Sequence, residues 1–264
     1  QSVGIDLSRV IHTPIMDVEQ LKFDLMGQLQ EITRDDRVFI AVDSIGNLAS
    51  KKEVEDAIDG KSVSDMTRAK QLKSLFRMVT PYLTLKDIPM VVVNHTYKTL
   101  ETYAKDVVGG GTGSYYSADN IYIIGRQQEK ETTGNKNLIG YNFIINVEKS
   151  RHVREKAKIP VTVLAKGGIS KWSGLLDMAE SAEMITKTTI GKSTGYQKID
   201  PDTGEILEQK YKVSETNTND FWLPILQSHK FNKWVEENYQ VGHGSILQEE
   251  DVSEDVYDEL VDED

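Results

Sequence analysis

The sequence predicts an α/β protein with a mostly parallel central sheet in its first part. Two short apolar runs, Val38–Val42 and Ile88–Val93, have the composition of strands that are covered on both faces. The stretch between them is long enough for the helical crossover that parallel strands require. Each run ends in polar residues, at the sheet edge where such folds gather their ligands. We therefore expect a strand–helix–strand unit with a binding edge.

Helices are predicted where apolar residues recur at spacings of three and four. Residues 18–32 show this pattern, and residues 66–79 show it after Ser64 and Asp65, which are candidate N-cap residues. Pro81 lies near the end of the second pattern. One helix is therefore expected before the first strand and another between the two strands.

The segment from Thr96 to Ser114 shows no apolar periodicity and contains four glycines. It is too long for an ordinary connection, so we expect a mobile loop with a function. Farther along, the turn sequence Asp200-Pro-Asp-Thr-Gly204 predicts a β-hairpin in a small C-terminal α+β subdomain. Further strands are expected at residues 121–124, 141–147 and 159–164, and short helices at residues 221–226 and 231–239.

The composition excludes several classes of protein. The 264 residues are 38% hydrophobic and 28% charged, near the soluble globular average, and no run approaches the roughly 18 apolar residues of a membrane-spanning helix. The absence of cysteine excludes a disulfide scaffold and a thiolate metal site, and no secretory signal pattern is present. We expect a cytoplasmic protein. Because the chain opens on Gln1 inside an ordinary fold segment, we also expect N-terminal sequence to be missing.

The net charge of −11 belongs to the C-terminal tail. Ten acidic residues lie from Glu249 onward, and no lysine or arginine follows Lys233. Removing these ten from the 42 acidic residues leaves 32 against 31 basic residues, so the rest of the chain is nearly neutral. A block of like charge is usually a solvated, disordered terminus, and the alternative is an electrostatic competitor for a basic groove.

Candidate site residues follow the two predicted strands. Asp43 and Ser44 come after the first, where a nucleotide-dependent ATPase places its magnesium carboxylate, and Asn94 and His95 come after the second. A capping aspartate and a structural histidine remain open alternatives. The phosphate-binding pattern G-x-x-x-x-G-K-[ST] occurs nowhere in the chain. These residues alone therefore predict an α/β domain with a ligand edge.

Lys149 and Arg151 form a separate candidate pair. They lie two residues apart at the end of the run at residues 141–147, so they point to the same side if that strand continues. Two cations on one face could clamp a polyphosphate, and a pair of exposed edge-strand charges is the alternative.

Six sequence blocks in a fixed order carry a family resemblance. They are residues 42–52, 64–70, 74–82 and 94–97, Gly109-Gly-Gly-Thr-Gly113 with residues 116–119, and residues 146–151. From about Gln1 to Gly242 the chain resembles a bacteriophage branch of the RecA recombinase family. The resemblance implies a RecA-like P-loop ATPase core, ATP and Mg²⁺ as cofactors, and a helical filament of this protein on single-stranded DNA.

The chain also departs from that family. In the family, the P-loop and the glutamate that polarises the attacking water lie upstream of the segment that matches Gln1–Pro14, and neither is present here. We therefore expect a truncated recombinase that, in isolation, is a poor ATPase at best.

The resemblance also implies roles for the candidate site residues. Asp43 is expected to hold Mg²⁺ through water, with Ser44 in the same motif, and His95 takes the place of the γ-phosphate sensor. Lys149 and Arg151 match two cations that reach the ATP of a neighbouring subunit.

Two DNA-binding loops are implied, at residues 54–65 and 96–112. Tyr97 and Tyr103 could pack on bases. The candidate DNA-binding residues are Lys51, Lys52, Lys61, Arg68, Lys98, Lys105, Gly109, Gly110 and Gly111.

The resemblance as a whole implies an ATP-dependent strand-exchange recombinase that acts in recombination, repair and recombination-dependent replication. Its expected partners are single- and double-stranded DNA, further copies of itself, and recombination mediator and single-strand-binding proteins. The expected domains are a core at residues 1–184, a subdomain at 185–242 and a disordered acidic tail at 243–264. A non-catalytic RecA-like DNA-binding module and a hexameric replicative helicase core are the alternatives.

Overall fold

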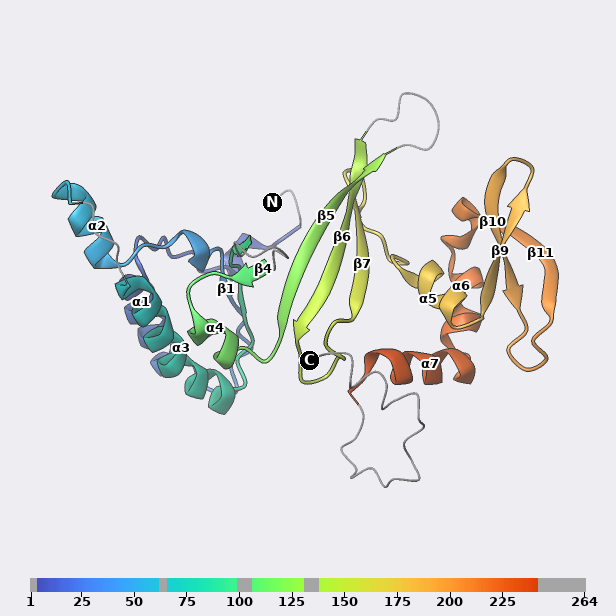
Figure 1. Cartoon of the computed structure of the whole chain (residues 1–264). Helices are drawn as coiled ribbons and strands as arrows, with labels where there is room; N and C mark the ends of the chain where they lie inside the picture. Colours follow the sequence, from blue (N-terminus) through green and yellow to red (C-terminus); the bar gives the residue numbers. More distant parts are fainter. Residues whose placement is uncertain (1–3, 62–65, 99–105, 131–137, 242–264) are drawn as a thin grey trace, which may run out of the picture. The chain divides into compact units, whose positions relative to one another are not determined.

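The computed structural model describes residues 4–61, 66–98, 106–130 and 138–241. The chain divides into two compact units, residues 1–119 and 120–264, and each unit is described by itself. Both units mix helices with strands (Figure 1), which confirms the α/β class in its general form. In the described part of the chain, no helix is long and apolar enough to cross a membrane.

In the first unit, two strands pair as the sequence predicts. β1 (Ile40–Val42) runs parallel to β2 (Met90–Val92). α1 (Val18–Glu31) precedes β1, and α3 (Thr67–Lys86) lies between the two strands in the sequence. The predicted strand–helix–strand unit is therefore confirmed.

The core of the first unit lies between the two helices and one face of the strand pair. Ile40, Val42, Met90 and Val92 pack against this core from the strands. The apolar residues at helical spacing are buried as predicted, namely Val18, Leu21, Leu25 and Leu29 in α1, and Leu72, Leu75, Phe76 and Val79 in α3.

The third helix is longer than its apolar pattern. It continues to Lys86 with Pro81 inside it, beyond the apolar pattern that ends at Val79. The Lys86 ammonium donates to the carbonyls of Leu29 and Ile32 at 2.5 Å each, where α1 ends and its carbonyls lack helical partners. This contact ties the ends of the two helices together. The candidate caps Ser64 and Asp65 lie outside the described residues.

The expectation that the strands are covered on both faces is wrong for the described residues. Ala41 and Val91 lie on the face opposite the core and are exposed, Val91 at 53%. Phe39 and Val93, which flank the strands, are also exposed. This alternation of half-buried and exposed positions is typical of a strand with one packed face.

Short elements occupy parts of the expected loops. α2 (Lys51–Ile58) covers the start of the first loop, and the Ser50 hydroxyl caps it by accepting the Glu53 N–H at 3.1 Å. At the second loop, β3 (Thr96–Lys98) pairs antiparallel with β4 (Asp106–Val108), and α4 (Thr112–Ser117) follows. The expectation of a long irregular segment is therefore wrong at both ends of residues 96–114. Residues 99–105 lie outside the described part.

The second unit begins with an antiparallel sheet in the order β5–β6–β7–β8. The strand runs expected from the sequence are confirmed, although the first two strands extend well beyond them (Figure 1). Among the described strands, only β1 and β2 pair in parallel, so the mostly parallel central sheet is not seen. The strands are β5 (Ile121–Lys130), β6 (Leu138–Lys149), β7 (Lys158–Leu164) and β8 (Gly168–Ile169).

A second core lies toward the end of the chain. The predicted hairpin is confirmed, with its turn closed by the Asp200 carboxylate, which accepts from Asp202 N and Thr203 N. Phe221 and Trp222 lie at most 1% exposed within this core. Its elements are α5 (Leu175–Ser181), β9 (Ile185–Ile190), β10 (Ser193–Ile199), β11 (Ile206–Lys212), α6 (Asn219–Leu226) and α7 (His229–Tyr239). The predicted C-terminal helices are thus confirmed, while α5 and β9 were not expected.

Candidate functional site

The polar residues after β1 and β2 lie at one edge of the strand pair. Val93 N donates to Val42 O at 2.9 Å, and Ile45 N donates to Val93 O at 3.0 Å, so the pairing continues past both strands. Asp43 is exposed and Ser44 is half-buried at this edge. The sequence prediction that the two strand ends lie together is therefore confirmed, because parallel strands end on the same side.

His95 packs against the turn that follows Asp43. This turn is η2 (Ile45–Asn47), a single turn of 3₁₀ helix. A Cβ on Gly46 would lie 2.2 Å from His95 Cδ2, so only glycine permits the imidazole to lie where it does. His95 Nε2 lies 3.1 Å from Asn47 Oδ1. Gly46 and Asn47 are site residues to which sequence reasoning gave no role, although they belong to the block that begins at Val42 and follow Asp43 closely.

Asn94 and His95 also form hydrogen bonds with Gly109, which directly follows the β3–β4 hairpin. Gly109 N donates to His95 O at 2.9 Å, and Asn94 Nδ2 donates to Gly109 O at 2.8 Å. His95 N in turn donates to Asn94 Oδ1 at 2.9 Å. Gly109, near the end of the expected second DNA loop, is thus hydrogen-bonded to the two residues that precede the first strand of that loop.

Of the three glycines expected to contact DNA, Gly110 and Gly111 pack against α3, and Gly109 lies against His95 and Asn94. Gly110 and Gly111 have φ values of +87° and +79°, which favour glycine. A Cβ on Gly110 would lie 2.7 Å from the Leu72 side chain. Backbone conformation and close packing therefore explain why glycine occupies these positions, independently of any contact with DNA.

Arg68 is buried more deeply than a surface cation, at the start of α3. Its guanidinium donates to the backbone carbonyls of Leu48 (2.6 Å), Ile45 (2.8 Å) and Gly46 (3.0 Å). The side chain is half-buried by these contacts. The structure thus places the Arg68 guanidinium against the backbone of the turn η2.

The candidate lysines of the first loop have acidic neighbours. All three side chains are at least half exposed, and exposed pairs of this kind add little stability. A phosphate could therefore replace the carboxylate. The pairs are Lys51–Glu55 at 4.0 Å, Lys52–Asp56 at 2.5 Å and Lys61–Asp59 at 2.9 Å. Lys98 is exposed on β3, whereas Lys105 and Tyr103 lie outside the described residues.

Lys149 and Arg151 do not share one strand. β6 ends at Lys149, and Arg151 lies in a bend. The Ser150 hydroxyl accepts from His152 N at 3.2 Å and from Val153 N at 3.1 Å, which turns the chain away from the strand. The alternation argument that placed both cations on one side therefore fails, because it required the strand to continue.

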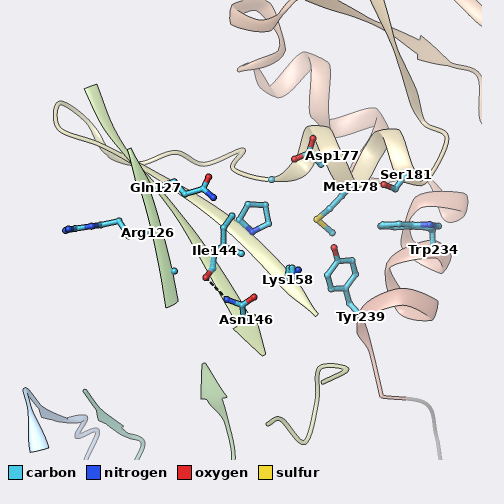
Figure 2. Close-up of a pocket in the computed structure, with 13 residues that line it drawn as sticks. Arg126, Gln127, Ile144, Asn146, Lys158, Asp177, Met178, Ser181, Trp234 and Tyr239 are labelled. Carbon is cyan, nitrogen blue, oxygen red and sulfur yellow. Dashed lines mark hydrogen bonds between the residues drawn. The ribbon is translucent and has the colours of Figure 1, made fainter. Parts of the chain in front are cut away.

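A cavity of about 670 Å³ opens in the second unit beside β5–β7, α5 and α7. Figure 2 shows Met178, Trp234 and Tyr239 grouped on the helical side, with Lys158 on the sheet side. Burial raises the pKa of the Tyr239 hydroxyl, and the Asp177 carboxylate adds to this effect. The lining combines aromatic, charged and amide groups but includes none of the predicted site residues.

The described residues hold no cluster of three or more acidic, histidine or cysteine side chains that could bind a metal by themselves. Asp43 is the carboxylate that the polar edge offers. Mg²⁺ keeps several waters and takes only one or two protein carboxylates beside substrate phosphates. The edge therefore suits a cation that arrives with a phosphate ligand.

Comparison with known proteins gives consistent similarities. The family model for the bacteriophage T4 recombination and repair protein, C-terminal domain, matches residues 172–235. The recombination and repair protein of Enterobacteria phage T4 is 45% identical over 99% of the chain and 66% of its own length. RecA of Borreliella burgdorferi (strain ZS7) is 21% identical over 68% of the chain and 50% of its own length. RecA of Mycoplasma mycoides subsp. mycoides SC is 20% identical over 81% of the chain and 65% of its own length. The chain thus spans between half and about two thirds of these relatives.

Proposed function

Because this chain belongs to the family of the phage T4 recombination and repair protein, the UvsX branch of the RecA recombinases, we propose that it is part of a DNA strand-exchange recombinase. The intact protein forms filaments on single-stranded DNA and pairs that strand with a homologous duplex, in an ATP-dependent manner, in the cytoplasm of a host cell. The observation that carries this proposal is the polar edge, where Asp43 and His95 follow two paired strands and the β3–β4 hairpin of the second loop begins.

The residues at this edge suit Mg²⁺ and ATP. Asp43 would hold a water of the hydrated cation, and Ser44 lies next to it in the sequence. His95 Nε2, which lies 3.1 Å from Asn47 Oδ1, could donate to an oxygen of the terminal phosphate in place of that contact. Bound ATP supplies the phosphoanhydride whose cleavage lets the filament release DNA. The P-loop and the glutamate that the family uses belong, in this proposal, to sequence upstream of Gln1.

Replacing Asp43 by asparagine tests the proposal in an intact protein that carries the upstream P-loop. We expect hydrolysis stimulated by single-stranded DNA to fall by about two orders of magnitude, which is typical when one preorganised charged group is removed. Asp35→Asn, in the exposed turn before β1, is the matched control and should hydrolyse ATP normally. Strand exchange is measured by joint-molecule formation, and particle shape by electron microscopy. Closed rings without strand exchange would support the helicase alternative.

The second loop gives a test of DNA binding. Replacing Lys98 and Lys105 by alanine should weaken binding to single-stranded DNA, because each lost phosphate contact releases fewer counterions. The slope of log affinity against log salt should fall by about 0.7 for each contact. Fluorescence anisotropy of a labelled oligonucleotide over a salt series measures both quantities. Lys166→Ala, an exposed site in the second unit, is the control, and an unchanged slope in the double variant would contradict the assignment.

A further inference from the structure

The turn η2 lies between two elements that lead to the expected DNA loops. Arg68 stands in the first turn of α3, three residues after the segment at residues 54–65. His95 leads directly into β3, the first strand of the hairpin at the second loop. Both side chains contact η2, so a shift of this turn would change the positions of Arg68 and His95, which adjoin the two loops in the sequence.

The Arg68 side chain stabilises the backbone of η2 through hydrogen bonds to its carbonyls. A guanidinium presents its N–H groups in a fixed planar fork, and here Nε and Nη2 donate to three carbonyls of one turn. A phosphate could engage this fork only if those carbonyls lost their donors. Lysine cannot reproduce the arrangement, because an ammonium is a compact charge without the planar fork.

The position of the His95 ring depends on the same turn. The imidazole lies against the Gly46 backbone so closely that no side chain fits between them. Since the amide oxygen of Asn47 can only accept, the contact at 3.1 Å is a hydrogen bond when the proton is on Nε2. The turn thus sets the place of His95 and favours its Nε2–H tautomer. The His95 carbonyl, in turn, accepts from Gly109 at the end of the hairpin.

We propose that Arg68, through η2 and Asn47, is a positioning residue for His95 and connects the first DNA loop to the second. The inference rests on the proposed function, in which His95 responds to the bound nucleotide. A change at His95 alters η2, and Arg68 carries that change to the start of α3 and the preceding loop. In this proposal Arg68 supports the turn rather than a DNA phosphate, which differs from the expectation from sequence.

The test measures nucleotide coupling in the intact protein. Coupling is the ratio of the Kd for a single-stranded oligonucleotide without nucleotide to the Kd with a slowly hydrolysed ATP analogue. Arg68→Lys and Asn47→Leu should each reduce this ratio at least about fivefold, the lower end of typical allosteric coupling. Asn47 is exposed, so its replacement leaves the core intact. Lys70→Ala, an exposed site on α3, is the matched control and should keep the full ratio.

Two further readouts separate positioning from DNA contact. Arg68→Ala should leave the salt slope of DNA binding unchanged, whereas loss of a phosphate contact would lower it by about 0.7. Nitrogen NMR of the imidazole should show His95 as the Nε2–H tautomer in the parent protein. Gly46→Ala, Asn47→Leu and Arg68→Lys should each change that spectrum, because each alters the turn against which the ring packs.

The outcomes are distinct. Normal coupling in both Arg68→Lys and Asn47→Leu would overturn the inference, as would a lower salt slope in Arg68→Ala. An unmodified protein that binds DNA without any response to nucleotide would overturn the proposed function itself, and this inference with it. Loss of coupling with an unchanged salt slope and an altered His95 spectrum would support the inference.

Discussion

Replacing Lys149 or Arg151 by alanine in the intact protein is expected to abolish DNA-stimulated ATP hydrolysis while nucleotide binding to the free monomer stays almost unchanged. The reason is that both cations are proposed to act on the ATP of the neighbouring subunit in the filament. Charge supplied in this way stabilises the phosphoryl-transfer transition state and typically contributes about 10³-fold or more in rate. Lys149 ends β6 and Arg151 lies in the bend after it, so each can be replaced without interrupting the strand.

Mixing experiments check this trans action. An Arg151→Ala protein mixed with a P-loop-defective one should recover part of the turnover. At some subunit interfaces the first protein then supplies an intact P-loop and the second supplies Arg151. Arg154→Ala is the control, because Arg154 is an exposed cation nearby whose backbone N–H donates to Tyr239 O, a contact that the substitution retains. Normal hydrolysis in both single variants on DNA would make Lys149 and Arg151 ordinary surface charges.

Phe221→Ala should strongly destabilise the second unit. Phe221 is 1% exposed, and its ring packs edge-on against Tyr211 and Trp222 with centroid distances of 4.9 and 5.0 Å. Truncating a buried phenylalanine typically costs about 3 to 5 kcal/mol through lost burial and a residual cavity. The free energy of unfolding can be measured from urea denaturation followed by tryptophan fluorescence. This probe is suitable because all three tryptophans of the chain, Trp172, Trp222 and Trp234, belong to the same core.

A neighbour on the same helix supplies the control. Leu223 is 46% exposed on α6, so Leu223→Ala should change the free energy of unfolding by about 0.5 kcal/mol or less. Equal effects of the two substitutions would contradict the burial of Phe221.

Local patterns were sufficient to predict many elements of both units. The helices α1 and α3, the strands β1 and β2, and the hairpin around Gly204 follow from residue spacing and turn chemistry. The strand-end position of Asp43 and His95 was also predictable, because it requires only that two buried strands run in parallel. Such signals act over a few residues and therefore survive without knowledge of distant contacts.

Other features depend on which segments meet in space. Nothing in the local pattern of residues 121–164 distinguishes parallel from antiparallel pairing, and the structure shows an antiparallel sheet. The apolar run around Val91 indicated two covered faces, but one face is exposed in the described residues. Apolar composition indicates that a strand can be buried, and tertiary packing decides which of its faces is.

By itself, the sequence determined that this chain is an α/β protein with acidic and imidazole groups at one strand edge and a nearly neutral body before an acidic tail. Only the tertiary structure showed that Gly46 and Asn47 hold His95, and that the Arg68 guanidinium supports their turn. The sequence alone does not show whether a charged side chain faces solvent or donates to backbone carbonyls. Its role is decided by partners some twenty to fifty residues away, because close approach and hydrogen-bond geometry arise only after the chain has folded.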